Sequence, residues 1–162
     1  PNDDWLRYTS PPGQVLKAQH ELRADFDGQI ELLGYDVQAP QPVNPGDAIH
    51  VILYWRALQP VMENYQTFLH VTGPEGYIWA QEDHINPGMQ PGGFPTTRWP
   101  LDKYVWDEYA VTIPGEAPEG VYTLHVGVYL LDTMERLPVF RNSGQYAGDR
   151  LTLAPFEIEA NE

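Results

Sequence analysis

Acidic residues near the start of the chain are spaced like part of a calcium-binding loop. Asp25, Asp27 and Gly28 begin a stretch that resembles an EF-hand loop. That loop needs glycine at its sixth position and glutamate at its twelfth, where this chain has Ile30 and Asp36. The stretch therefore predicts a tight turn with solvated acids.

The five histidines lack the H-E-x-x-H and H-x-H spacings of metal sites. His84 follows Glu82 and Asp83, and these three side chains offer a loose cation site or, as the favoured interpretation, a solvated strand end. We therefore predict no metal site.

Nucleophile motifs are missing as well. The chain has no cysteine, and its two serines, Ser10 and Ser143, stand outside any G-x-S-x-G motif. Neither a P-loop nor a G-x-G-x-x-G motif occurs. With 23 acidic residues, no particular carboxylate pair for glycoside hydrolysis stands out. We expect no catalytic residue and no cofactor, although an enzyme with an unrecognised carboxylate site remains an alternative.

The segment GGFPTTRW is the most distinctive polar and aromatic cluster. Arg98 and Trp99 could clamp a sugar ring, with the indole stacked on its apolar face. In the favoured alternative, Trp99 folds back over the open end of the domain.

Composition restricts the partners. The net charge of −14 repels nucleic acid and anionic lipid, while sugars, cations and basic partners stay compatible. No run approaches the roughly 18 apolar residues of a membrane span. The chain begins at Pro1 without an initiator methionine or a signal-like segment, so we expect a piece of a larger protein.

Strand patterns dominate from residue 25 onward. Alternating or apolar runs separated by Pro and Gly turns occur at residues 29–37, 47–58, 65–83, 103–113, 120–131 and 150–160. They predict an all-β, immunoglobulin-like, antiparallel two-sheet β-sandwich of seven or eight strands. We expect the sandwich to cover residues 25–160, after an N-terminal arm or linker of residues 1–24 with a short strand near residues 15–20. Pro155 suggests a bulge or edge position in the last strand.

Two aromatic residues mark the expected core. Trp55 shares the apolar face of its strand with Leu53 and Val51. Tyr122 follows Pro118 and Gly120 in the spacing of a tyrosine corner, whose hydroxyl bonds back to the preceding loop.

A candidate ligand surface follows from the order of strands in immunoglobulin-like sandwiches. The strand with His70 would neighbour the strand with His125, which gathers Phe68, His70, His125 and Tyr129 on an outer face, with a shallow gap at Gly127. Grouped aromatics suit sugar stacking or protein contact. In the favoured alternative, the N-terminal arm covers this patch through Trp5, Leu6 and Tyr8.

Several segments together resemble a known family: GQIELLGYDV, PGDAIHVILYWRAL, YQTFLHVTGPEG, PTTRW and PEGVYTLHVGVYLLDTMERLPV. They are similar to the soluble C-terminal domain of bacterial multi-spanning membrane glycosyltransferases, relatives of the dolichyl-phosphate-mannose–protein mannosyltransferases. The resemblance covers residues 26–139. Where that family reads YD-x-x-TG-x-RLPV, this chain has Met134 in place of the glycine, so the hairpin there is expected to differ.

The resemblance implies a non-catalytic extracytoplasmic accessory domain of the cell envelope, tethered to the membrane through the rest of its parent protein. Its role would be structural, or weak recognition of a glycan or acceptor protein. The family's catalytic acids lie in its membrane portion, so no catalytic residue carries over. A carbohydrate-binding module of a secreted glycoside-active enzyme is the alternative.

Overall fold

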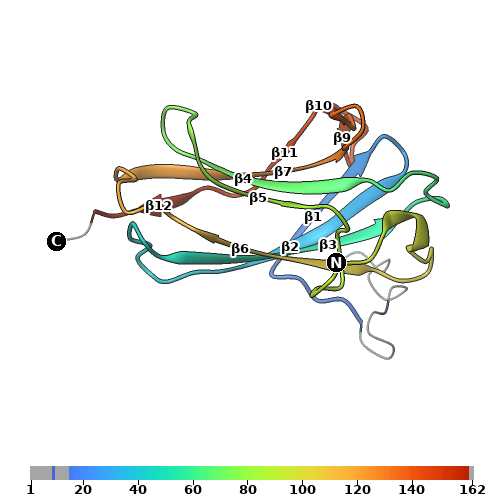
Figure 1. Cartoon of the computed structure of the whole chain (residues 1–162), viewed down its shortest axis with the longest axis horizontal. Coiled ribbons are helices and arrows are strands. Elements are labelled where there is room, and N and C mark those ends of the chain that lie inside the picture. The colour runs from blue at the N-terminus through green and yellow to red at the C-terminus, as the bar shows by residue number, and fades with distance from the viewer. Residues whose placement is uncertain (1–8, 10–14, 161–162) are drawn as a thin grey trace.

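The chain folds into a β-sandwich of two antiparallel sheets (Figure 1), in a computed structural model that describes Thr9 and residues 15–160. The first sheet has the order β10-β9-β1-β2-β3-β6, and the second the order β11-β7-β4-β5, with β8 and β12 also paired to β7. The longer strands are β1 (His20–Phe26), β2 (Ile30–Gln38), β3 (Ala48–Ala57), β4 (Gln66–Thr72), β5 (Ile78–His84), β6 (Val105–Thr112) and β7 (Gly120–Leu130). The shorter ones are β8 (Glu135–Arg136), β9 (Val139–Arg141), β10 (Tyr146–Gly148), β11 (Leu151–Thr152) and β12 (Phe156–Ile158). The predicted fold class is confirmed.

Helix is nearly absent from the described residues, where η2 (Thr96–Arg98) is a single 3-10 turn. No helix in this part of the chain has the length and apolarity that crossing a bilayer requires.

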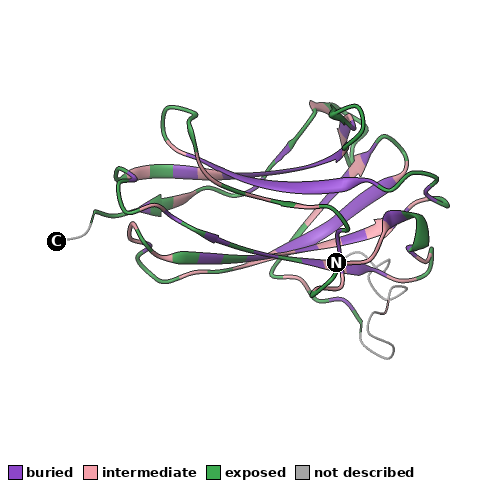
Figure 2. Cartoon of the chain, in the orientation of Figure 1, coloured by how far each residue is buried: buried purple, intermediate pink, exposed green. Residues whose placement is uncertain are grey.

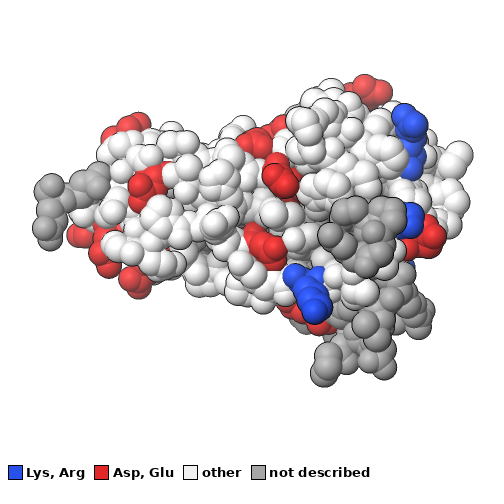
Figure 3. Space-filling model, turned by 90° about the horizontal axis from the view of Figure 1, so that it is seen from below, with Lys and Arg blue, Asp and Glu red and all other residues white. Residues whose placement is uncertain are grey.

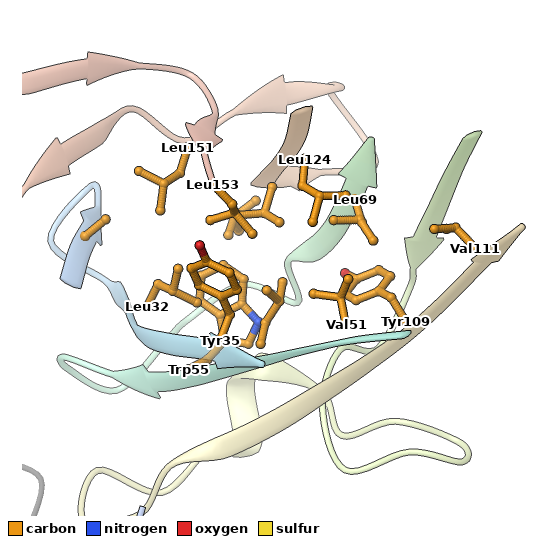
Figure 4. Close-up of a cluster of buried hydrophobic side chains, with 14 of the residues drawn as sticks. Leu32, Tyr35, Val51, Trp55, Leu69, Tyr109, Val111, Leu124, Leu151 and Leu153 are labelled. Carbon is orange, nitrogen blue, oxygen red and sulfur yellow. The ribbon is translucent and has the colours of Figure 1, made fainter. Parts of the chain in front are cut away.

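The core lies between the sheets and follows the predicted alternation. Along β3, Val51, Leu53 and Trp55 are fully buried. Val51 and Trp55 point toward the opposite sheet, which carries Leu69 and Leu124 (Figure 4). Phe26 packs edge-on against the Trp55 ring at 5.2 Å. Trp55 is therefore a central core residue, as predicted.

The tyrosine corner is also present. Tyr122 is fully buried, and its hydroxyl donates a hydrogen bond to the carbonyl of Pro118 at 2.6 Å. This bond fixes the loop that enters β7.

Strand β1 begins at His20, inside the range expected to form the arm. It pairs with both β2 and β9, but its register with β2 shifts between Glu21 and Ala24, which obscures the alternation. Just before β1, Leu16 packs on Leu33 and Tyr104. This segment is thus attached to the sandwich.

The acidic turn between β1 and β2 is a hairpin turn, as predicted. Asp27 and Gly28 have φ of 56° and 69°, and the amide of Gly28 donates to Asp25 Oδ1 at 2.5 Å.

The last part of the chain departs from the expected single strand. Pro155 separates β11 from β12, and both pair with β7. Between β7 and β8, Met134 adopts a left-handed φ of 60°, in the place where the family that the sequence resembles has glycine.

Strand β6 forms the edge of the first sheet, and loop side chains reach its outer amides. Gln90 Oε1 accepts from the amide of Glu108 at 3.1 Å, and Glu82 Oε1 accepts from that of Ala110 at 3.2 Å. The amide of Met89 donates to the carbonyl of Trp106 at 2.5 Å.

Candidate functional site

The structure brings together the predicted aromatic and histidine cluster on β4 and β7. His70 pairs directly with His125 across the two strands, so the expected strand neighbours are confirmed. The Phe68 ring lies 4.5 Å from the His70 ring and 6.2 Å from the Tyr129 ring, measured between centroids.

This cluster is closed to solvent. Its four members, Phe68, His70, His125 and Tyr129, are only 2%, 8%, 6% and 6% exposed, and β4 is buried along its length (Figure 2). The gap expected at Gly127 is filled by Phe68, since a Cβ on that glycine would lie 2.3 Å from the ring. The Arg136 guanidinium covers the Phe68 ring at 4.6 Å. Trp5, Leu6 and Tyr8, the predicted cover, lie outside the described residues.

Two polar members of the cluster, His125 and Tyr129, have hydrogen-bond partners, and the Tyr129 hydroxyl donates to Asp83 Oδ2 at 2.7 Å. The two ring nitrogens of His125 lie 2.9 and 3.0 Å from the hydroxyls of Thr72 and Thr152. Burial, followed by the nearby Arg150 and His70, lowers the pKa of His125 to about 4. Because hydroxyls can donate as well as accept, they suit this neutral imidazole.

Arg98 and Trp99, the other predicted ligand-binding residues, do not form a clamp for a sugar ring. Trp99 is 4% exposed and belongs to the core, where its indole N–H donates to the carbonyl of Phe94 at 2.8 Å. Arg98 is exposed and lies 5.5 Å from the Phe94 ring. The two side chains therefore face different environments.

An acid–histidine network, in which Asp107 is buried and His84 and Glu82 are half-buried, joins the edges of the two sheets. His84 Nδ1 lies 2.5 Å from Asp107 Oδ1, and its Nε2 lies 2.5 Å from Glu82 Oε2. Asp107, fully buried on β6, also accepts from the Thr67 hydroxyl at 2.8 Å and from the Trp55 indole at 3.3 Å. His84 is thus neither a solvated strand end nor a loose cation site.

The network favours a charged histidine. Carboxylates only accept hydrogen bonds, so both ring nitrogens of His84 must carry hydrogens for both bonds to form. Burial alone lowers the pKa of His84, but the hydrogen bonds and charges of Asp107 and Glu82 together raise it. The ring also stacks on Tyr109 at 4.0 Å.

The arrangement of Glu82, His84 and Asp107 does not suit metal binding or proton transfer to a substrate. Glu82 and Asp107 approach opposite nitrogens of the His84 ring, so the three groups do not converge on one point. Within the described residues, no group of three or more histidines and acids could hold a metal ion. With both nitrogens engaged, His84 has none free to take a proton from a substrate.

An open groove lies instead at the far end of the sandwich, between the β4–β5 hairpin and the loop before β7. It has a volume of about 490 Å³ and is lined by Pro74, Glu75, Tyr77, Trp79, Pro118 and Glu119. Tyr77 is 64% exposed, and its ring meets the Trp79 ring at 4.9 Å and 68°. We call this the Tyr77–Trp79 groove.

Local backbone features shape the Tyr77–Trp79 groove. Val71 pairs with Ala80 but Thr72 with Ile78, so Trp79 is the extra residue of a β-bulge, which re-aims its side chain. The indole lies against Gly73, where a Cβ would come within 2.8 Å of its Nε1.

Both walls of the groove are held in place. The amide of Gly73 donates to the carbonyl of Tyr77 at 2.9 Å, which closes the hairpin. The opposite wall is fixed by the bond from Tyr122 to Pro118. A Cβ on Gly120 would lie 2.6 Å from Pro74 Cγ, so the two walls touch through a glycine.

The sequence predictions missed this groove. The signal was the sequence GYIW, in which two aromatics stand two residues apart directly after a glycine turn. The predicted hairpin and tyrosine corner were correct, but only the fold brings Pro118 beside Pro74.

A second hollow, of about 380 Å³, opens between the sheets beside Tyr35, Leu124 and Phe156. His20 stacks on the Tyr35 ring at 4.7 Å and covers it, so Tyr35 is only 3% exposed. The hollow therefore offers less open aromatic surface than the Tyr77–Trp79 groove.

Comparisons with known proteins establish the fold. The C-terminal domain of Wzt matches with a TM-score of 0.57 at 8% identity, over 89% of this chain and 84% of that one. A CARDB domain from Pyrococcus furiosus matches with a TM-score of 0.44 at 10% identity, over 90% of this chain and all of that one. No family model and no curated protein matches. At so low an identity, the likeness to the Wzt domain shows the two-sheet β-sandwich fold alone.

Proposed function

We propose that the chain is a non-catalytic accessory domain of a bacterial membrane glycosyltransferase, on the extracytoplasmic side, and that it contacts glycan through the Tyr77–Trp79 groove. The observation that carries this proposal is an aromatic pair, exposed Tyr77 and half-buried Trp79, that lines a groove together with two carboxylates. Sugar rings stack on aromatic faces, and their hydroxyls hydrogen-bond to carboxylates, so the groove has both kinds of contact.

The place of the domain in a glycosyltransferase rests on the sequence resemblance over residues 26–139. A non-catalytic role is supported by the engaged nitrogens of His84 and by the missing nucleophile motifs. The same groove would serve a carbohydrate-binding module of a secreted enzyme. The gene upstream of Pro1 separates the two: membrane spans there support the first, and a glycosidase domain supports the second.

Glycan contact can be tested by NMR titration of the labelled chain with mannose-, glucose- and galactose-type oligosaccharides. We expect shifts of the Trp79 indole and Tyr77 amide signals, which Tyr77→Ala should weaken. Tyr146→Ala is the matched control, because Tyr146 is 62% exposed on β10, away from the groove.

Silence at the groove across all three sugar types would overturn the proposed site. NMR shifts confined to His70 and His125 would indicate that glycan binds at the β4–β7 sheet face that was predicted from the sequence. Sugar release from a glycoside panel, above a buffer blank, would contradict the non-catalytic role.

A further inference from the structure

We infer that the Tyr77–Trp79 groove selects glycans that carry a protonated amino group, such as an oligomer of glucosamine. This inference rests on the glycan-binding function proposed above and names the class of sugar. It is carried by the charges around the groove and by the geometry of its two rings.

Among the residues that the structure describes, the charges around the groove are acidic. The segments 73–78 and 113–119 and strand β12 contain no Lys or Arg, but they contain Glu75, Glu116, Glu119 and Glu157. On the face shown in Figure 3, acidic side chains and no basic ones lie at the left-hand end, and the Lys and Arg side chains lie from the middle of the view to the right. A cationic ligand is attracted to this end, and an anionic one is repelled.

The two rings meet edge to face, and Tyr77 is the exposed member of the pair. The Tyr77 and Trp79 planes meet at 68°, with centroids 4.9 Å apart. Trp and Tyr faces attract ammonium groups, so the exposed Tyr77 ring offers a cation a favourable contact. Glu75 and Glu119 line the same groove and supply the carboxylates that an ammonium group also needs.

The rest of the sugar fits the same surface. Pro74 and Pro118 add apolar contact beside the rings, so a pyranose can lie against the groove while its amino group faces the carboxylates. Because hydrogen bonds within the chain hold both walls, little ordering is needed on binding. A sugar with a free amine therefore gains both kinds of contact.

Three trimers with the same linkage test the inference: glucosamine, N-acetylglucosamine and glucose. Calorimetry at low salt and pH 6 should show the glucosamine trimer binding about tenfold more tightly than the other two. The preference should fall as salt is added, because screening weakens charge attraction.

A pair of double variants assigns the preference to the groove. Glu75→Gln with Glu119→Gln should bring the three affinities within about twofold, a loss of the charge attraction described above. Asp132→Asn with Glu135→Gln is the control, because it removes an equal number of negative charges from exposed positions between β7 and β9. It should leave the preference for the glucosamine trimer unchanged.

The outcomes separate this inference from the function on which it rests. Equal binding of all three trimers by the native chain would overturn the selection for an amino group and leave glycan binding standing. No binding of any trimer would overturn both. Tetralysine binding as tightly as the glucosamine trimer would overturn the assignment to a sugar, since charge alone would then suffice.

Discussion

Replacing Asp107 with asparagine should be among the most damaging single changes in the domain. The buried carboxylate accepts from four donors: His84 Nδ1, the Thr67 hydroxyl, the Gly88 amide and the Trp55 indole. In Asp107→Asn, one oxygen becomes an amino group, which faces donors instead of accepting from them.

The size of the effect follows from these contacts. An unsatisfied buried donor costs about 1–3 kcal/mol, and breaking a buried ion pair by removing one partner costs about 3–5 kcal/mol. We expect Asp107→Asn to lower the free energy of unfolding by about 4 kcal/mol, which is a large share of the roughly 5–15 kcal/mol of a typical domain.

Urea unfolding followed by tryptophan fluorescence at pH 7 measures this change. Glu108→Gln is the matched control, because it removes one charge from the adjacent, exposed position of β6 and should change stability by less than about 0.5 kcal/mol. Equal effects of the two substitutions would refute the structural role of the buried carboxylate.

The pH dependence of the same network has a definite sign. The raised pKa of His84 means that its stabilising contribution is complete below the ordinary value of 6.5 and is lost as pH rises through the folded-state value. The stability difference between the native chain and His84→Gln should therefore be larger at pH 6 than at pH 9. A difference that grows with pH would contradict a charged His84 in the network.

Three further changes test the packing and the other end of the pH range. Gly127→Ala should lower the free energy of unfolding by about 1–3 kcal/mol, because the new methyl group collides with the Phe68 ring. Gly115→Ala is the control, because open space surrounds its Cβ. Equal unfolding midpoints for the two variants would count against the tight packing of Gly127 on Phe68. Met134→Gly should raise stability by about 0.5–1 kcal/mol, since glycine accepts the left-handed φ without strain, and a lower melting temperature would disprove this. His125 has a folded-state pKa of about 4, so its contribution to stability is present above pH 6.5 and is lost as the pH falls from 6.5 to 4. His125→Gln should therefore make stability depend less on pH in this range. An unchanged pH dependence would exclude a lowered pKa for His125.

Local patterns allowed much of the fold to be predicted. The alternation around Val51, Leu53 and Trp55 follows from the two-residue period of a strand, which needs no partner to be recognised. The Tyr122 corner depends on a bond to Pro118, only four residues away. Features of short range such as these appear directly in the sequence.

Long-range features could not be predicted in the same way. Asp107 lies 23 residues from His84 and on the other sheet, so their contact cannot be predicted from a sequence spacing. Whether the space beside Gly127 stays open depends on the register of β4 and β7. Gly127 pairs directly with Phe68, and the Phe68 ring fills this space. The strand neighbours were predicted correctly, but the depth of burial required the pairing of individual residues.

The covered edge of β6 has a consequence for how copies of the chain behave together. An outer strand with free amides is a template for pairing with a strand of another molecule, the first step of many aggregation reactions. Here Gln90 and Glu82 already occupy the outward amides of Glu108 and Ala110, and residue 89 bonds to Trp106. An incoming strand would have to displace these groups, so the side chains at this edge help concentrated chains to remain separate.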